Sequence, residues 1–178
     1  MLAARMRPVP ITALSLCNGM GMTTAEVLAG LLVGRSGLGP CPPEIGLATP
    51  GGATVGAMPG PLPALPAALA AYDTRQGRIA ALALHELERP IARARERWGA
   101  RRVAVILGTS TGGIGASELA FAYHQAHGVL PDWYDVETSH ALDAALPVVC
   151  AMTGLAGPAY MLSTACSSSA KVFAAAQR

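Results

Sequence analysis

The segment that most constrains the fold is an unbroken apolar run, Val103-Ala104-Val105-Ile106-Leu107, which leads directly into a glycine-rich loop over residues 108–115. β-Branched residues favour strands, and a strand without polar alternation is typical of a parallel sheet covered on both faces. Parallel strands need crossover connections, which are usually helices. The run therefore predicts an α/β fold with helices on both sides of a sheet.

The segments around this run have the patterns of such crossovers. Apolar residues between Thr74 and Trp98 recur at helical spacing, and Pro90 breaks or restarts that helix. After the run we expect helices over residues 118–127, 141–152 (bent at Pro147) and 167–178, an irregular stretch over 131–137, and a short strand over 159–163. The order of strands and helices fits the α/β interpretation.

The N-terminal part of the chain reads as a strand, a loop and a helix. Val9–Leu16 is β-prone, Thr23 or Thr24 can cap a helix that runs from Glu26 to about Leu32, and Gly34 ends it.

The next segment is rich in proline. Residues 40–66 hold eight of the 14 prolines, which predicts an extended, irregular segment with one edge strand over 53–58. Its interspersed apolar residues favour a loop laid over a larger body, with an interdomain linker as the alternative.

The composition describes the packing that such layers need. Hydrophobic residues make up 52% of the chain, 35 residues are alanine and only 4% are aromatic, so elements must pack closely on small side chains. Charged residues make up only 13% of the chain, so little charged surface is available to cover so much apolar sequence. We expect the chain to be part of a larger protein.

The charges exclude one class of partner. The formal net charge is +2, with no long basic run and no interleaving of basic and aromatic residues, so nucleic acid is not expected. Arginines cluster only between Arg89 and Arg102, where Glu86, Glu88 and Glu96 alternate with them. This pattern favours a solvated face, and an acidic protein partner is the alternative.

Cysteine and histidine spacing gives no metal site. The four cysteines form no CxxC pair, and His124 and His127 share a helix face without an acidic or cysteine ligand near them in sequence. We expect reduced thiols, no metal and no tightly bound cofactor. No apolar stretch reaches the roughly 18 to 20 residues that span a bilayer, and no signal peptide is visible, so we expect a cytoplasmic protein without a membrane span.

The strongest chemical signal is Leu162-Ser163-Thr164-Ala165-Cys166-Ser167-Ser168-Ser169-Ala170, a strand, a tight turn and a helix. A thiol at a helix N-terminus faces unpaired amides and the positive end of the helix dipole, which stabilises a thiolate. Small neighbours leave room for a substrate carbonyl. The pattern makes Cys166 a candidate nucleophile, and a small core residue is the alternative.

A second motif points to different chemistry. Gly108-Thr109-Ser110-Thr111-Gly112 matches G-x-S-x-G, the turn that carries the nucleophile of serine hydrolases, and it follows a buried strand. Asp132, Asp135 and His140 follow in hydrolase order, but too few residues separate them for the usual strand and helix units. A tight turn that needs glycine for close packing explains the motif as well.

Taken in order, these segments resemble the N-terminal half of β-ketoacyl-acyl-carrier-protein synthases, the condensing enzymes of fatty-acid and polyketide synthesis. The similar segments are Pro10–Ser15 with Gly30–Gly37 ("L-x-x-G-x-S-G"), Arg102–Gly113 ("V-x-x-G-T-x-x-G-G"), and Gly154–Pro158 with Ser163–Ser168 ("G-x-x-G-P…T-A-C-x-S"). The last of these motifs is the most specific.

The resemblance implies a thiolase-like fold with αβαβα layers, of which residues 1–178 would be most of the first half. Cys166 would take an acyl group from the phosphopantetheine arm of an acyl-carrier protein, and a decarboxylated malonyl unit would then attack the acyl-cysteine. Thr111 would approach the acyl pocket. A homodimer, or a heterodimer with a related ketosynthase, is implied as well. Cys166 also distinguishes the chain from chain-length-factor relatives, which lack this cysteine.

The chain departs from the family pattern after the nucleophile. The family's two histidines and lysine that handle malonyl decarboxylation follow the cysteine at a distance, whereas the four histidines here precede Cys166, and Lys171 does not match the distant lysine. We therefore expect a fragment that is catalytically incomplete by itself.

The leading hypothesis is a ketosynthase-type acyltransferase with Cys166 as nucleophile. The rivals are a non-catalytic subunit of the same fold and a serine hydrolase that uses Ser110.

Overall fold

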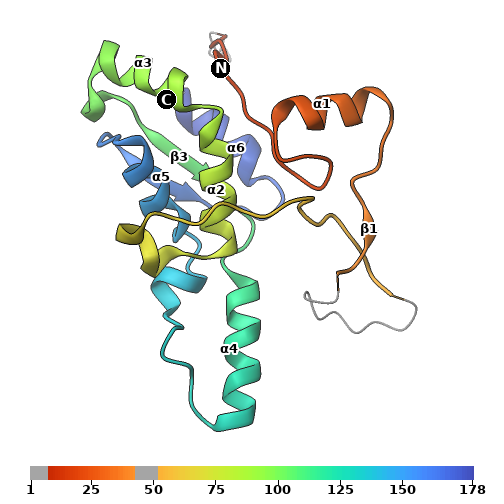
Figure 1. Cartoon of the computed structure of the whole chain (residues 1–178). Coiled ribbons are helices and arrows are strands. Elements are labelled where there is room, and N and C mark those ends of the chain that lie inside the picture. The colour runs from red at the N-terminus through yellow and green to blue at the C-terminus, as the bar shows by residue number, and fades with distance from the viewer. Residues whose placement is uncertain (1–7, 43–51) are drawn as a thin grey trace, which may run out of the picture.

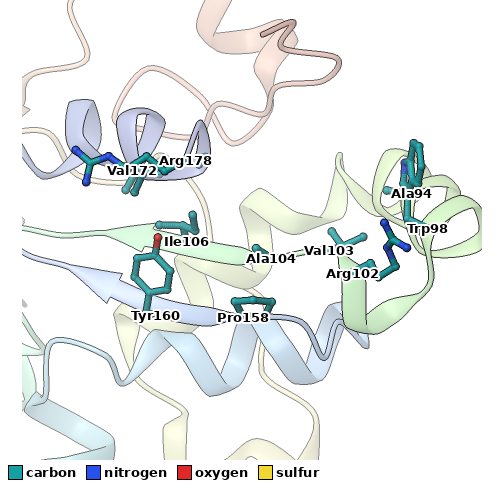
Figure 2. Close-up of a pocket in the computed structure, with 12 residues that line it drawn as sticks. Ala94, Trp98, Arg102, Val103, Ala104, Ile106, Pro158, Tyr160, Val172 and Arg178 are labelled. Carbon is teal, nitrogen blue, oxygen red and sulfur yellow. The ribbon is translucent and has the colours of Figure 1, made fainter. Parts of the chain in front are cut away.

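The computed structural model describes residues 8–42 and 52–178. Two parallel strands lie among the helices that pack together in it (Figure 1). β3 (Val105–Gly108) pairs with β4 (Ala159–Leu162), with Val105 opposite Ala159 and Gly108 opposite Leu162. The helix α6 (Ser168–Ala176) covers one face of this pair and α5 (Ala145–Thr153) the other (Figure 2). The predicted α/β layers and the parallel pairing are confirmed.

A further helical layer lies outside α5. It consists of α2 (Arg75–His85) and α3 (Glu88–Trp98), which both pack against α5. The core between these layers is built on Val105, Val149 and Leu155, each less than a tenth exposed. The surrounding side chains are of modest size and partly buried: Ala80, Leu84, Ile91, Val103, Leu107, Leu146 and Cys150.

Pro90 restarts the helix, which is one of the two alternatives predicted from the sequence. The chain leaves α2 at Glu86, and α3 begins at Glu88, so Pro90 lies in the first turn of α3. A proline there removes an amide that has no helical partner in any case. A short 3₁₀ turn, η3 (Ala100–Arg102), then leads into β3.

The predicted N-terminal helix is α1 (Thr24–Leu32), and both of its ends have side-chain or backbone caps. Thr23 and Glu26 form a reciprocal capping box at its start. At its end Gly34 has φ +67°, the Gly34 amide donates to Leu31 O, and the Arg35 amide donates to Gly30 O at 2.9 Å. This is the Schellman arrangement, which favours glycine because of the left-handed backbone.

The strand expected over Val9–Leu16 is wrong. The segment is not part of a ladder, and Val9, Ile11 and Leu14 are 66%, 69% and 59% exposed. β-Propensity produces a strand only where a neighbouring strand offers backbone partners. In the described part of the chain β3 pairs with β4, and no further strand joins them.

The proline-rich segment is extended, as expected, over its described residues. Its edge strand is shorter than predicted: β2 (Thr54–Val55) pairs antiparallel with β1 (Gly39–Pro40). Residues 43–51 of this segment lie outside the described residues. The short 3₁₀ segment η2 (Ala67–Tyr72), which the sequence did not signal, follows.

The helices between the two central strands begin at other residues than predicted. Helix α4 (Ile114–His127) starts four residues earlier, immediately after the glycine-rich loop, and α5 starts four residues later. Pro147 lies in the first turn of α5 and so does not bend it. The predicted irregular stretch ends in η4 (Val136–His140), a single π-helical turn whose first amides are capped by Asp135.

Glu86 fastens the N-terminal segment to the end of α2. Its carboxylate accepts from the amide of Thr24 at 3.1 Å and from the hydroxyls of Thr24 and Ser15. Thr24 is the first residue of α1, so the carboxylate also lies at the positive end of that helix. The hydrogen bonds from Thr24 hold the pKa of Glu86 below its ordinary value.

We predict that Glu86→Gln loosens residues 15–33 at neutral pH. A carboxyl whose pKa is lowered on folding stabilises the fold above its ordinary pKa, and this contribution is lost as pH falls through the lowered pKa. Hydrogen exchange of residues 15–33 should be faster in Glu86→Gln than in the wild type at pH 7 and equal in both in acid. The control is Glu88→Gln, because the carboxylate of Glu88 contacts His85. Equal exchange of wild type and Glu86→Gln at pH 7 would contradict the tether.

Candidate functional site

Cys166 lies in the turn between β4 and α6, as predicted from the sequence. It directly precedes Ser167, the N-cap of α6, and its side chain is exposed. Ala165 before it has φ +51° and is the single non-glycine residue with positive φ in the described ranges. A left-handed alanine is strained, and such strain persists only where neighbouring contacts hold the turn.

The contacts that hold this turn converge on Ser168. Ser168 is 2% exposed, and its hydroxyl accepts from the amide of Thr164 at 2.9 Å and lies 2.7 Å from Ala165 O and 2.9 Å from Thr109 O. The hydroxyl has one proton, which it can donate to either carbonyl. Ser168 thus connects the cysteine turn to the loop that follows β3.

Gly108 allows the same two segments to approach closely. A Cβ at this position would lie 2.7 Å from Val172 Cγ2 and 3.0 Å from Ser168 O, both on α6. Any other residue would push the first turns of α6 away from β3. Gly108, which follows the apolar run, therefore fixes the distance between α6 and β3, and with it the position of Cys166.

Thr111 lies in the loop after β3, at the same end of the sheet as Cys166. Thr109 Oγ1 donates to Thr111 O at 2.7 Å and accepts from the Thr111 amide at 3.3 Å, and this local bond shapes the loop. The side chain of Thr111 is exposed. The structure therefore places both predicted site residues in neighbouring loops at the carboxyl ends of parallel strands, where α/β folds commonly bind ligands.

Gly112 and Gly113 are explained by backbone contacts with another segment. A Cβ on Gly112 would collide with His140 O, and a Cβ on Gly113 would collide with Ser139 O. The Gly113 amide donates to His140 O at 3.1 Å. The glycine pair is needed because the end of η4 lies directly on the loop.

The hydrolase arrangement is not assembled. His140 Nδ1 lies 2.6 Å from the hydroxyl of Ser117 on α4, and that buried hydroxyl also contacts Tyr134 at 2.8 Å. Asp135 caps η4 through Thr138. In residues 8–42 and 52–178 no hydrogen bond joins Ser110 to Asp132, Asp135 or His140. The alternative reading of this motif, a turn that needs glycine, fits the contacts.

The predicted pair His124 and His127 lies on exposed α4. The ring of His127 stacks on Tyr123 with centroids 4.0 Å apart. Over the described residues no three histidine, cysteine, aspartate or glutamate side chains lie together as a metal site would need. Over the same residues, no helix combines the length and the apolar character that crossing a bilayer requires.

The four cysteines are free thiols in different surroundings. Cys166 is exposed, whereas Cys17, Cys41 and Cys150 are half-buried. Burial raises the pKa of Cys150, and burial together with the negative charge of Glu86 raises the pKa of Cys17. The exposed thiol in the strained turn is the most accessible of the four.

One cleft among the described residues lies away from Cys166. It has a volume of about 680 Å³ and lies beside the amino-terminal half of the sheet, between the ends of α3 and α6 (Figure 2). Trp98, Arg102, Tyr160 and Val172 are among its lining residues. It takes no part in the geometry of the cysteine turn.

Sequence reasoning missed the positioning residues. Ser168 stands in a run of three serines, and nothing in the sequence distinguishes it from Ser167 and Ser169. Only the tertiary fold shows that one of the three is buried against the loop after β3. Ser117 was missed for the same reason, since its partners Tyr134 and His140 are distant in sequence.

Comparison with known proteins gives one consistent result. Residues 6–178 match the family model described as "Beta-ketoacyl synthase, N-terminal domain". Two similar solved structures are a ketosynthase (ApeO) in complex with its chain length factor (ApeC) from Xenorhabdus doucetiae, 28% identical with a TM-score of 0.77, and a β-ketoacyl synthase from Burkholderia phymatum, 20% identical with a TM-score of 0.70. A search of curated proteins found no match.

The matches cover nearly all of this chain and less than half of the similar ones. Each alignment covers 94% of this chain and 42% of the solved chain. The fold is therefore the corresponding part of the ketosynthase α/β fold, and the thiolase-like expectation is confirmed to that extent.

We predict that Ser168→Ala destabilises the chain by about 1 to 3 kcal/mol, because it leaves the Thr164 amide and the Thr109 carbonyl without this buried partner. Chemical denaturation measures the change. Ser169→Ala removes a hydroxyl from the exposed neighbouring position and should change stability by less than about 0.5 kcal/mol. Equal effects of the two substitutions would contradict the role of Ser168.

A second prediction concerns thiol reactivity. Iodoacetamide at pH 7 should alkylate Cys166 roughly tenfold or more faster than Cys17 or Cys150, because those two are half-buried and have raised pKa values. Peptide mapping of a time course measures the rates. Faster labelling of Cys150 would show that the turn is less accessible than its geometry indicates.

Proposed function

Because this chain belongs to the β-ketoacyl synthase family through that family's N-terminal domain, we propose that it carries the nucleophile of a condensing acyltransferase. The observation on which the proposal depends is the exposed Cys166 in a strained strand-to-helix turn that hydrogen bonds of the buried Ser168 hold in place. A thiol at such a turn is presented to substrate and lies at the positive end of α6.

The proposed reaction has two steps. In the first, the thiolate of Cys166 attacks the carbonyl of an acyl thioester, the carrier thiolate leaves, and an acyl-cysteine forms. In the second, a malonyl thioester loses CO₂, its α-carbon attacks the acyl-cysteine carbonyl, and the carbon–sulfur bond breaks to return the thiolate of Cys166. One carbon–carbon bond forms.

The described residues contribute to the first step. The Ser168 hydroxyl and Gly108 fix the cysteine turn against β3, so the thiol has one position relative to the loop that carries Thr111. In this proposal Thr111 borders the pocket for the acyl chain. Small residues around Cys166, such as Ala165 and Ser167, leave space for the thioester.

The remaining steps need groups that the resemblance places after the nucleophile. In the family, two histidines and a lysine that follow the cysteine at a distance handle malonyl decarboxylation. The histidines of this chain all precede Cys166. The proposal therefore assigns acyl transfer to Cys166 and leaves decarboxylation to residues outside residues 1–178.

The partners belong to the proposal as well. We propose that the acyl and malonyl groups arrive on the phosphopantetheine arm of an acyl-carrier protein, in a cytosol that keeps Cys166 reduced. A second ketosynthase-type chain, identical or related, is the proposed subunit partner, since the similar ApeO occurs in a complex with its chain length factor. Large apolar side chains on α4, Leu119 at 67% and Phe121 at 62% exposed, support a partner that covers this helix.

We predict that Cys166 is acylated when a protein containing this chain, together with the rest of its ketosynthase, is mixed with an acyl-carrier thioester. Mass spectrometry of the digest should find the acyl group on Cys166, and Cys166→Ala should abolish it. Ser110→Ala is the matched control and should leave acylation unchanged. Acylation of Ser110, or of neither residue, would overturn the proposal; the latter result would favour the non-catalytic subunit.

A further inference from the structure

The loop that carries Thr111 is held at both of its ends. At its start the hydroxyl of Ser168 lies 2.9 Å from Thr109 O. At its end the amide of Gly113 donates to His140 O at 3.1 Å. Thr111 lies between these two points and is exposed. Its position is therefore set by two anchors, and only the first of them belongs to the cysteine turn.

The second anchor is a close contact between two stretches of backbone. Gly113 has φ −78° and ψ 61°, and the Ile114 amide donates to Gly112 O at 2.9 Å, so a tight inverse γ-turn directly precedes α4. The carbonyls of Ser139 and His140, at the end of η4, lie so close that a Cβ on either glycine would collide with them. Because there is no free space between the two segments, a shift of η4 is passed on to the loop.

A cluster of three side chains holds η4 in this place. The hydroxyl of Ser117, in the first turn of α4, lies 2.6 Å from His140 Nδ1 and 2.8 Å from the hydroxyl of Tyr134. The Ser117 hydroxyl can donate to an unprotonated Nδ1 while it accepts from Tyr134, and it can accept from a protonated Nδ1. The contact is therefore compatible with both protonation states of the histidine. We call Ser117, Tyr134 and His140 the serine–histidine cluster.

The cluster holds the loop and is not placed to attack a substrate. Ser117 is 7% exposed and its hydroxyl is shared between two side chains, so it is not presented as the nucleophile of an acyl transfer has to be. The loop is contacted by the backbone carbonyl of His140, whereas the ring of His140 faces Ser117. The ring thus fixes the residue whose carbonyl fixes the loop, which is a positioning role.

We propose that the serine–histidine cluster positions the loop of Thr111 and thereby sets the length of acyl chain that Cys166 accepts; this inference rests on the proposed function, in which Thr111 borders the acyl pocket. One methylene group that fits or fails to fit a pocket changes a reaction rate by roughly 10- to 200-fold, provided that the pocket wall does not yield. A loop held at both ends gives such a wall, whereas a loop held only at Thr109 yields to a longer chain. Loss of the cluster therefore lowers discrimination and leaves the chemistry of the thiol intact.

The first measurement follows the loop without an acyl substrate, in this chain together with the rest of its ketosynthase. Ser117→Ala and His140→Leu should speed hydrogen exchange in the peptide that contains Gly113 by about threefold or more, because its amide loses the support of the cluster. His140→Asn should exchange like the wild type, since a carboxamide offers a donor and an acceptor near the position of Nδ1. The control is His85→Leu, because His85 is an exposed histidine that contacts Glu88.

The second measurement compares acyl-carrier thioesters of increasing even chain length. Mass spectrometry gives the rate at which each one acylates Cys166, and the steepest fall in rate marks the length limit of the wild type. In Ser117→Ala and His140→Leu this fall should become about fivefold shallower or more, while the rate with the shortest thioester stays within about threefold. His140→Asn and His85→Leu should keep the wild-type profile. A merely structural role of the cluster would lower all rates together and leave their ratios unchanged.

Three results would overturn the proposal. Unchanged exchange in both Ser117→Ala and His140→Leu would show that the cluster does not hold the loop. Faster exchange with an unchanged length profile would show that the loop does not set the accepted length. Equal effects of His140→Asn and His140→Leu would show that the hydrogen bond to Ser117 is not the cause. A wild type without any acyl group on Cys166 would instead overturn the proposed function, and the exchange comparison would still decide whether the cluster holds the loop.

Discussion

The buried hydroxyl of Ser168 is the interaction on which the candidate site depends. It connects three backbone groups from two loops that are about 60 residues apart in sequence, the Thr164 amide and the carbonyls of Ala165 and Thr109. Ser168 itself is buried, so its hydroxyl would be costly to leave unpaired, and it is paired with these three groups. The strained backbone at Ala165, the start of α6 and the exposure of Cys166 all follow from that junction.

The same junction explains why this chain is so rich in small residues. Gly108 lets α6 approach β3, Gly112 and Gly113 let the end of η4 lie on the loop, and each position would hold a Cβ in collision with backbone or side-chain atoms. Close layers leave little room for aromatic side chains, which are 4% of the sequence. Composition and site geometry are consequences of one packing arrangement.

Much of the fold could be predicted from local signals, and the failures have a common cause. The run before Gly108 predicted a strand in a parallel sheet, and Thr23 or Thr24 with Gly34 predicted the ends of α1, because burial pattern and capping are properties of neighbouring residues. The strand expected over Val9–Leu16 failed because a strand needs a partner that local propensity does not supply.

The sequence by itself determined the two central strands and the helices around them, the cysteine at a strand-to-helix turn and the family to which the chain belongs. Only the tertiary structure decided which serine of three holds the turn, that His140 contacts Ser117 and not Ser110, and that Arg95 of α3 is turned towards the end of α5 while Arg89 and Arg93 are exposed. The physical reason is the range of the interactions. Helix caps, turns and burial patterns act within a few residues, whereas buried hydrogen bonds and close glycine contacts join segments that only folding brings together.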